Sequence, residues 1–164
     1  MLRAITNRST RARGGSFVIV ASRYNAKYVE AMLRAARAEL NRAGARRVRV
    51  VRVPGAYEIP VVAARLARCG GAESGASSAN SRPGAIICLG VILRGETVHA
   101  AHIGEAVSRA LMEIQVRFEV PVIHEVLLLE NEAQARVRCL GKKHNRGAEA
   151  AQTALAMASL MATL

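Results

Sequence analysis

Apolar residues along this chain follow two alternating patterns, one typical of buried strands and one typical of helices. Residues 17–21 read FVIVA, a continuous apolar run expected for a strand that is buried on both faces. Residues 26–43 instead place apolar side chains one helical turn apart, and Gly44 then ends the helix. Together the patterns predict strands over 17–21, 48–53, 85–93 and 122–129, and helices over 26–43, 61–68, 99–118, 130–140 and 148–164.

This order of elements predicts an α/β fold. Strands that alternate with helices are joined by crossover connections, and these produce a parallel sheet with helices on both faces. We therefore expect a three-layer α/β/α sandwich around a four-stranded parallel sheet of the flavodoxin-like kind.

Two segments depart from the alternating pattern. Residues 70–84 are rich in Gly, Ser, Ala and Asn, which predicts a surface loop inside a single domain spanning 16–164. Residues 1–15 hold four Arg and no acid, which predicts a disordered basic tail. The alternative for the tail is a targeting signal, because its composition resembles that of a transit peptide.

Ligands of parallel sheets bind beyond the carboxyl ends of the strands, so the residues that directly follow strands are the candidates for chemistry. Three segments qualify: 22–25, 54–58 and 94–99. The last combines a glycine, a hydroxyl and free backbone N–H groups at a helix start, which favours an anion cradle. His99 at the helix entrance could exchange protons with a ligand held there. The alternative is that Thr97 only caps the helix and that His99 is a surface residue.

The other candidate segments also have two interpretations. Glu58, in a turn fixed by two prolines, could hold ligand hydroxyls or be a helix-start charge favoured by the dipole. Tyr24 could stack on a planar ligand or complete the edge of the core. The basic stretch 136–146 could clamp a phosphate through its guanidinium groups or form a solvated face.

Charge adds a competing hypothesis. The 164 residues carry 24 Lys and Arg against 12 Glu and no Asp, a net charge of +12. A site that needs Asp, such as a typical EF-hand loop, is thereby excluded. The positive charge favours a nucleic-acid-binding module with steeply salt-dependent binding. Against it, the charge is scattered, no binding motif is present, and few aromatic residues are available for stacking.

The spacing of the cysteines and the length of the apolar runs indicate the cellular compartment in which we expect the protein. Cys69, Cys88 and Cys139 are far apart and form no CxxC pair, which argues against a disulfide framework and a zinc site. The longest apolar run, 84–93, is too short to span a bilayer. We therefore expect a cytoplasmic protein that binds neither a metal nor a membrane.

Several sequence blocks together carry a family resemblance: ASRYN (21–25), VPGAYEIP (53–60), LGVILRGETVH (89–99), VPVI (120–123), ENEAQARVR (130–138), HNRGAEAA (144–151) and LAMASL (155–160). From about residue 17 to the C-terminus the chain resembles the lumazine synthase family of riboflavin biosynthesis. The VPGA-[FYL]-E-[IL]-P and RGET-x-H blocks are highly specific to that family.

The resemblance implies a reaction. Lumazine synthases condense 5-amino-6-(D-ribitylamino)uracil with 3,4-dihydroxy-2-butanone 4-phosphate, release phosphate and water, and need no metal or organic cofactor. Because the two substrates supply the amine and the ketone, the protein would mainly hold and orient them and move protons.

The resemblance also implies residue roles. His99 matches the proposed general acid/base, Glu96 and Thr97 match the pair at the substrate phosphate, and Arg138 matches the phosphate-binding arginine. Residues that match the binding segments for the other substrate are Tyr24 and Asn25 at the pyrimidine ring, Ala56, Tyr57 and Glu58 at the ribitylamino-uracil, and Val91, Ile92 and Leu93 as the backbone strip along the pyrimidine edge.

Three positions depart from the family pattern. His124 stands where Phe is usual, which would make the neighbouring subunit's wall against the heterocycle less apolar. Arg146 stands where Lys is usual, so the charge is kept and the geometry changes. Ala101 stands where an acid is usual, two residues after His99. These departures favour, as an alternative, a catalytically impaired shell-forming paralogue.

The resemblance finally implies an assembly. The family forms pentamers whose active sites are shared between adjacent subunits, and some members build an icosahedral capsid from twelve pentamers. Arg138 and Arg146 are eight positions apart, a spacing that resembles that of capsid-forming members, and a pentamer or a decamer stays open as the alternative. Association with riboflavin synthase is a further partner that the resemblance allows.

Overall fold

A computed structural model of the chain describes residues 15–69, 82–141 and 144–164. Its four strands are all parallel and lie in the order β2-β1-β3-β4. Their bounds are Ser16–Ser22 for β1, Arg47–Val53 for β2, Ala85–Leu93 for β3 and Val122–Leu129 for β4. The chain places β2 on one side of β1 and β3 on the other. The switch point where ligands of such sheets bind therefore lies between β1 and β3.

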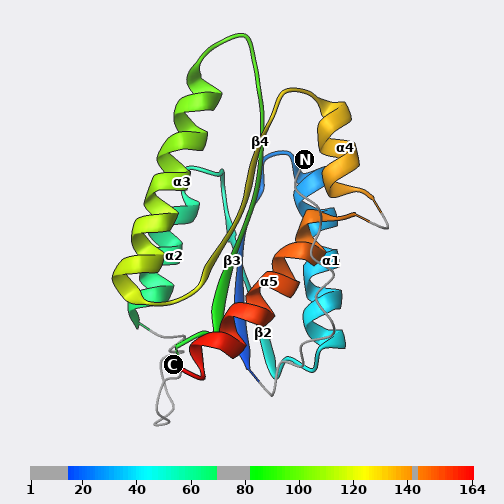
Figure 1. Ribbon diagram of the computed structural model, residues 1–164. Coiled ribbons are helices and arrows are strands. Elements are labelled where there is room, and N and C mark those ends of the chain that lie inside the picture. The colour runs from blue at the N-terminus through cyan, green and yellow to red at the C-terminus, as the bar shows by residue number, and fades with distance from the viewer. Residues whose placement is uncertain (1–14, 70–81, 142–143) are drawn as a thin grey trace.

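Five helices cover the two faces of the sheet (Figure 1). The helices α2 (Ile59–Cys69) and α3 (His99–Phe118) lie on one face. The helices α1 (Ala26–Arg42), α4 (Glu132–Cys139) and α5 (Arg146–Met161) lie on the other. The predicted three-layer α/β/α fold is therefore confirmed.

The core consists of two layers separated by the sheet, which explains the uninterrupted apolar run of β1. Phe17, Ile19 and Ala21 pack toward α1 and α5, whereas Val18 and Val20 pack toward α2 and α3. Each of these five side chains is at most 4% exposed. Burying an apolar side chain of this size stabilises the fold by about 1.5–3 kcal/mol, so both faces of one strand contribute.

Side-chain caps explain why α4 and α5 begin at residues other than those predicted. Asn131 accepts a hydrogen bond from the Gln134 N–H at 3.0 Å, and α4 begins after it. Asn145 accepts one from the Gly147 N–H at 2.9 Å, so α5 begins two residues earlier than its pattern predicts. After α1, Gly44 adopts φ +80, as expected of a glycine that terminates a helix.

Two predicted segments are only marginally covered by the described residues. Except for Gly15, the basic tail lies outside them, and so do residues 70–81 of the expected surface loop. Within the described ranges, none of the helices has both the length and the apolar character needed to cross a membrane.

Candidate active site

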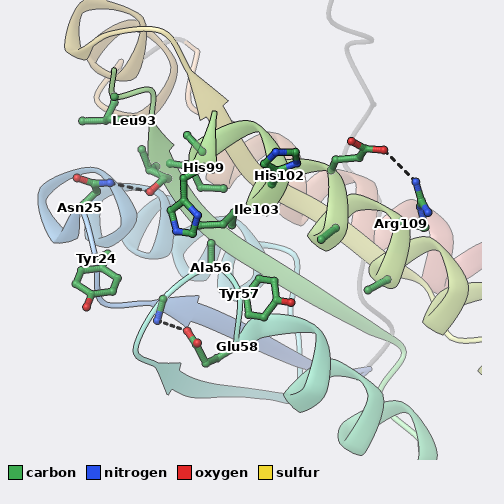
Figure 2. A pocket seen from close by; sticks show the side chains of 18 of the residues that line it. Tyr24, Asn25, Ala56, Tyr57, Glu58, Leu93, His99, His102, Ile103 and Arg109 are labelled. Atoms are coloured by element: carbon green, nitrogen blue, oxygen red, sulfur yellow. Dashed lines mark hydrogen bonds and ion pairs between the residues drawn. The ribbon is translucent and has the colours of Figure 1, made fainter. Parts of the chain in front are cut away.

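The segments that follow β1, β2 and β3 meet at one groove of about 1140 Å³ at the carboxyl edge of the sheet (Figure 2). Hydrogen bonds tie these segments together. The Tyr24 N–H donates to the Pro54 carbonyl at 3.2 Å, and the Asn25 side-chain amide donates to the Val91 carbonyl at 2.8 Å. Three segments far apart in the sequence therefore form one wall.

The strand β3 presents backbone to this groove because its two neighbours end at different points. Its ladder with β1 ends at Ala21↔Leu89, whereas its ladder with β4 continues to Leu93↔Leu129. Residues 90–93 of β3 thus have one paired edge and one edge that faces the groove. Such an edge offers N–H and C=O groups to a planar ligand.

The turn between β2 and α2 is closed by the Glu58 carboxylate. Its Oε2 accepts a hydrogen bond from the Gly55 N–H at 2.9 Å. A Cβ added at Gly55 would lie 2.9 Å from this oxygen and 3.1 Å from the Tyr24 ring, so a larger residue there would have to displace these two side chains. Glu58 therefore has a structural function at the helix start, and its other oxygen, Oε1, takes no part in this bond.

Two aromatic rings stand at the groove with most of their surface exposed. Tyr24 is 72% exposed and Tyr57 is 63% exposed. A tyrosine that completes a core edge would be largely buried, as Tyr28 is at 4%. Both rings are therefore available for stacking on a ligand.

His99 is the first residue of α3, and its imidazole points toward Ala56 across the groove (Figure 2). The residue at the N-cap is Val98, and it makes no side-chain cap hydrogen bond. The alternative that Thr97 caps this helix is therefore wrong. Thr97 lines the groove instead, next to the start of α3.

Ten of the fourteen predicted site residues line the groove: Tyr24, Asn25, Ala56, Tyr57, Glu58, Val91, Ile92, Leu93, Thr97 and His99. Four do not. Glu96 is exposed on the loop before α3, and His124, Arg138 and Arg146 lie on β4, α4 and the start of α5. The groove thus gathers most, and not all, of the predicted site residues. Lys142 and Lys143 of the basic stretch lie outside the described residues.

Comparison with known proteins identifies the family. A family model for 6,7-dimethyl-8-ribityllumazine synthase matches residues 14–162. The chain belongs to the lumazine synthase family. A protein of that name from Xanthomonas campestris pv. campestris (strain B100) is 40% identical over 159 residues, 96% of this chain and 94% of the relative. Another from Xylella fastidiosa (strain 9a5c) is 40% identical over 156 residues, 94% of each chain.

The resemblance implied an acid where Ala101 stands, and the fold shows where this position lies. Ala101 is exposed and does not line the groove, whereas Ala100 and His102 do. In this chain, position 101 therefore supplies no side chain to the groove beside His99.

The departure at His124 gives a neutral ring. Its Nδ1 accepts a hydrogen bond from the Val126 N–H at 3.3 Å, and its Nε2 lies 2.8 Å from the Ser108 hydroxyl. That hydroxyl donates to the Gly104 carbonyl at 2.7 Å, so Nε2 carries the histidine proton. Burial lowers the pKa of His124. His124, at the position where the resemblance implied Phe, is thus a flat, uncharged ring.

Arg146 is paired with two acidic side chains that were not predicted from the sequence. Its Nε donates to Glu125 Oε2 at 3.0 Å, and its Nη1 donates to Glu149 Oε2 at 2.8 Å. Glu125 is 6% exposed and follows the alternation of β4 into the core. A single acid at a core-facing position of an apolar strand was the signal that could have revealed it.

Sequence reasoning also missed the α3 side of the groove. Beyond His99 the groove continues along one face of this helix, past side chains that recur every three or four residues: His102, Ile103, Ala106, Arg109, Ala110 and Glu113. Glu105 also lines it and accepts a hydrogen bond from Arg109 at 2.9 Å. Helical spacing from His99 would have predicted this face. Among the described residues, no cluster of three His, Cys or Glu is placed to hold a metal ion.

Proposed function

We propose that the chain is an enzyme that condenses 5-amino-6-(D-ribitylamino)uracil with 3,4-dihydroxy-2-butanone 4-phosphate to 6,7-dimethyl-8-ribityllumazine. The observation that carries the proposal is the single groove at the ends of β1, β2 and β3, which gathers ten of the predicted site residues. Family membership supports the same activity.

In this proposal the groove holds the uracil substrate. The ring stacks on Tyr24, and the backbone of residues 91–93, on the edge of β3 that lies beyond its ladder with β1, bonds the pyrimidine edge. Glu58, anchored at Gly55 through Oε2, accepts ribityl hydroxyls at Oε1. Thr97 and Glu96, on the loop before α3, lie at the phosphate of the second substrate.

His99 moves the protons of the reaction. The 5-amino group adds to the ketone and loses water to give an imine, and elimination then releases inorganic phosphate. This elimination leaves an enol that tautomerises to a new ketone. The ribitylamino nitrogen attacks this ketone, and loss of a second water closes the ring. Each step needs a proton taken up or delivered near one atom of the substrate, which an exposed imidazole at the groove can do.

We further propose that an adjacent subunit completes the site with His124, Arg138 and Arg146. These residues do not line the groove of their own chain, and a shared site accounts for that. The assembly in this proposal is a pentamer, with an icosahedral capsid of pentamers as its larger form, in the cytoplasm. Riboflavin synthase is the proposed associated partner.

The test is to mix the purified protein with the two substrates and to follow the absorbance of the lumazine product. We expect product formation that scales with enzyme concentration and releases one phosphate per product. Absence of product at every enzyme concentration would contradict the proposal and favour a shell-forming paralogue that has lost catalysis.

A further inference from the structure

A buried acid of β4, Glu125, is paired with Arg146, one of the two arginines that the proposed function places at the shared site. Glu125 and Glu149 each accept a hydrogen bond from the Arg146 guanidinium, at 3.0 and 2.8 Å. The Arg146 side chain is 36% exposed, whereas that of Glu125 is only 8% exposed. Arg146 is thus drawn toward the protein interior by its partners.

The surroundings of Glu125 make its charge costly. The groups that face it are Arg146 and Glu149 from α5, and Arg138 and Cys139 from α4. Arg138 is close enough for its charge to lower the pKa of Glu125, as does Arg146. Burial outweighs both, and the pKa of Glu125 is raised to about 7. Near neutral pH the carboxyl therefore exists in both its charged and its neutral form.

Phosphate and carboxylate compete for guanidinium because both offer pairs of oxygens to its planar fork of N–H donors. The Nε and Nη1 donors of Arg146 are already used by carboxylates, whereas Arg138 is exposed. In addition, a buried anion behind the arginines repels an incoming dianion more strongly than an exposed one would.

We propose that Glu125 lowers the affinity of the site for the phosphate-bearing substrate by acting as an internal competitor for Arg146. This inference rests on the proposed function. The substrate phosphate binds first through Arg138 and gains Arg146 only when it displaces Glu125. Glu125 is thus a residue that acts through Arg146 and does not itself contact the substrate.

The experiment compares Glu125→Gln with Glu39→Gln in the native assembly. Glu39 is a matched control, because it is also a carboxylate paired with an arginine, Arg42, on the far end of α1. Binding of sulfate and of inorganic phosphate is measured by calorimetry at pH 8, and the KM of each substrate is measured beside it. We expect Glu125→Gln to bind both anions about 5-fold to 10-fold more tightly and to lower the KM of the phosphate substrate alike.

Further readouts separate competition for Arg146 from a general structural effect of the substitution. The KM of the ribitylamino substrate stays unchanged in Glu125→Gln, and Glu39→Gln matches the wild type in every constant. The double variant Glu125→Gln/Arg146→Gln loses the gain in anion affinity. Sulfate keeps its charge between pH 6 and pH 8, so the difference between wild type and Glu125→Gln should shrink at pH 6, where Glu125 is mostly protonated.

Equal anion affinity of Glu125→Gln and wild type at pH 8, within twofold, would overturn the proposal. If Glu125→Gln does not fold, the wild type alone still tests it, since sulfate binding that is no tighter at pH 6 than at pH 8 contradicts it. Failure of the proposed function looks different: the wild type then makes no product, while the calorimetric comparison still reports on competition for Arg146.

Discussion

His99 combines high exposure with a fixed position at the first turn of α3, which suits a group that exchanges protons. Replacing it with alanine removes the imidazole from the groove without opening a cavity in the core. We expect His99→Ala to lower kcat by about 10-fold or more and to leave the thermal midpoint unchanged. Steady-state kinetics checks the kcat, and a thermal melt checks the midpoint. An unchanged kcat would show that another group moves the proton.

Glu125 makes the stability of the fold depend on pH. Its pKa is raised to about 7 in the folded chain, against about 4.3 for an unperturbed Glu. The folded state therefore holds this proton more tightly, so the stability it contributes below pH 4 is lost as the pH rises through 7. Between pH 5.5 and pH 8 we expect a loss of about 2 kcal/mol.

Urea unfolding of the wild type and of Glu125→Gln at those two pH values measures this loss. The variant cannot titrate at position 125, so its free energy of unfolding should fall by less between the two pH values. The difference between the two losses is the contribution of Glu125. Equal losses in the two proteins would show that Glu125 titrates at its ordinary pKa in the folded chain.

The contact between α1 and α5 depends on a glycine. A Cβ added at Gly147 would overlap the carbonyl group of Met32, and neither backbone can move without separating the two helices. This contact holds α5, and with it Arg146, against the body of the domain. At this scale a single methyl group is therefore enough to disturb an element that carries a predicted site residue.

We expect Gly147→Ala to lower the free energy of unfolding by about 3 kcal/mol, the upper range for overpacking. Gly95→Ala is the matched control, because nothing lies within 4 Å of a Cβ at that position. Urea denaturation of both variants provides the comparison. Similar midpoints for the two would mean that α1 and α5 yield at this contact without cost.

At the scale of the whole molecule, the separation of Arg138 from the groove predicts complementation between inactive subunits. His99→Ala damages the groove, and Arg138→Ala damages the residue proposed to reach a neighbour's groove. In a mixed assembly of equal amounts, about a quarter of the shared sites combine an intact groove with an intact arginine. We expect co-expressed variants to recover about a quarter of the wild-type activity.

Assays of each variant alone and of the co-assembled mixture measure this recovery. If one subunit supplied both residues to the same site, the mixture would show no more activity than the two variants separately. The native mass of the mixture, measured in parallel, shows whether the subunits have assembled.

The order of strands and helices could be predicted from the sequence because it depends on short-range patterns. FVIVA at 17–21 is apolar at every position, and β1 is buried on both faces as a result. The predicted segments 22–25, 54–58 and 94–99 follow strand ends, and parallel strands carry such segments to a common edge. The family motifs contain most of the residues that line the groove, because these motifs follow the ends of the strands.

Other features depend on packing between distant segments, which the sequence pattern does not specify. The different lengths of the β1 and β4 ladders leave one edge of residues 90–93 facing the groove. Glu58 closes its own turn because the chain brings the Gly55 N–H within 2.9 Å of it. Arg146 pairs with Glu125 because α5 crosses β4. The sequence by itself determined the family and the fold, and only the tertiary structure decided which charged groups are free to meet a ligand.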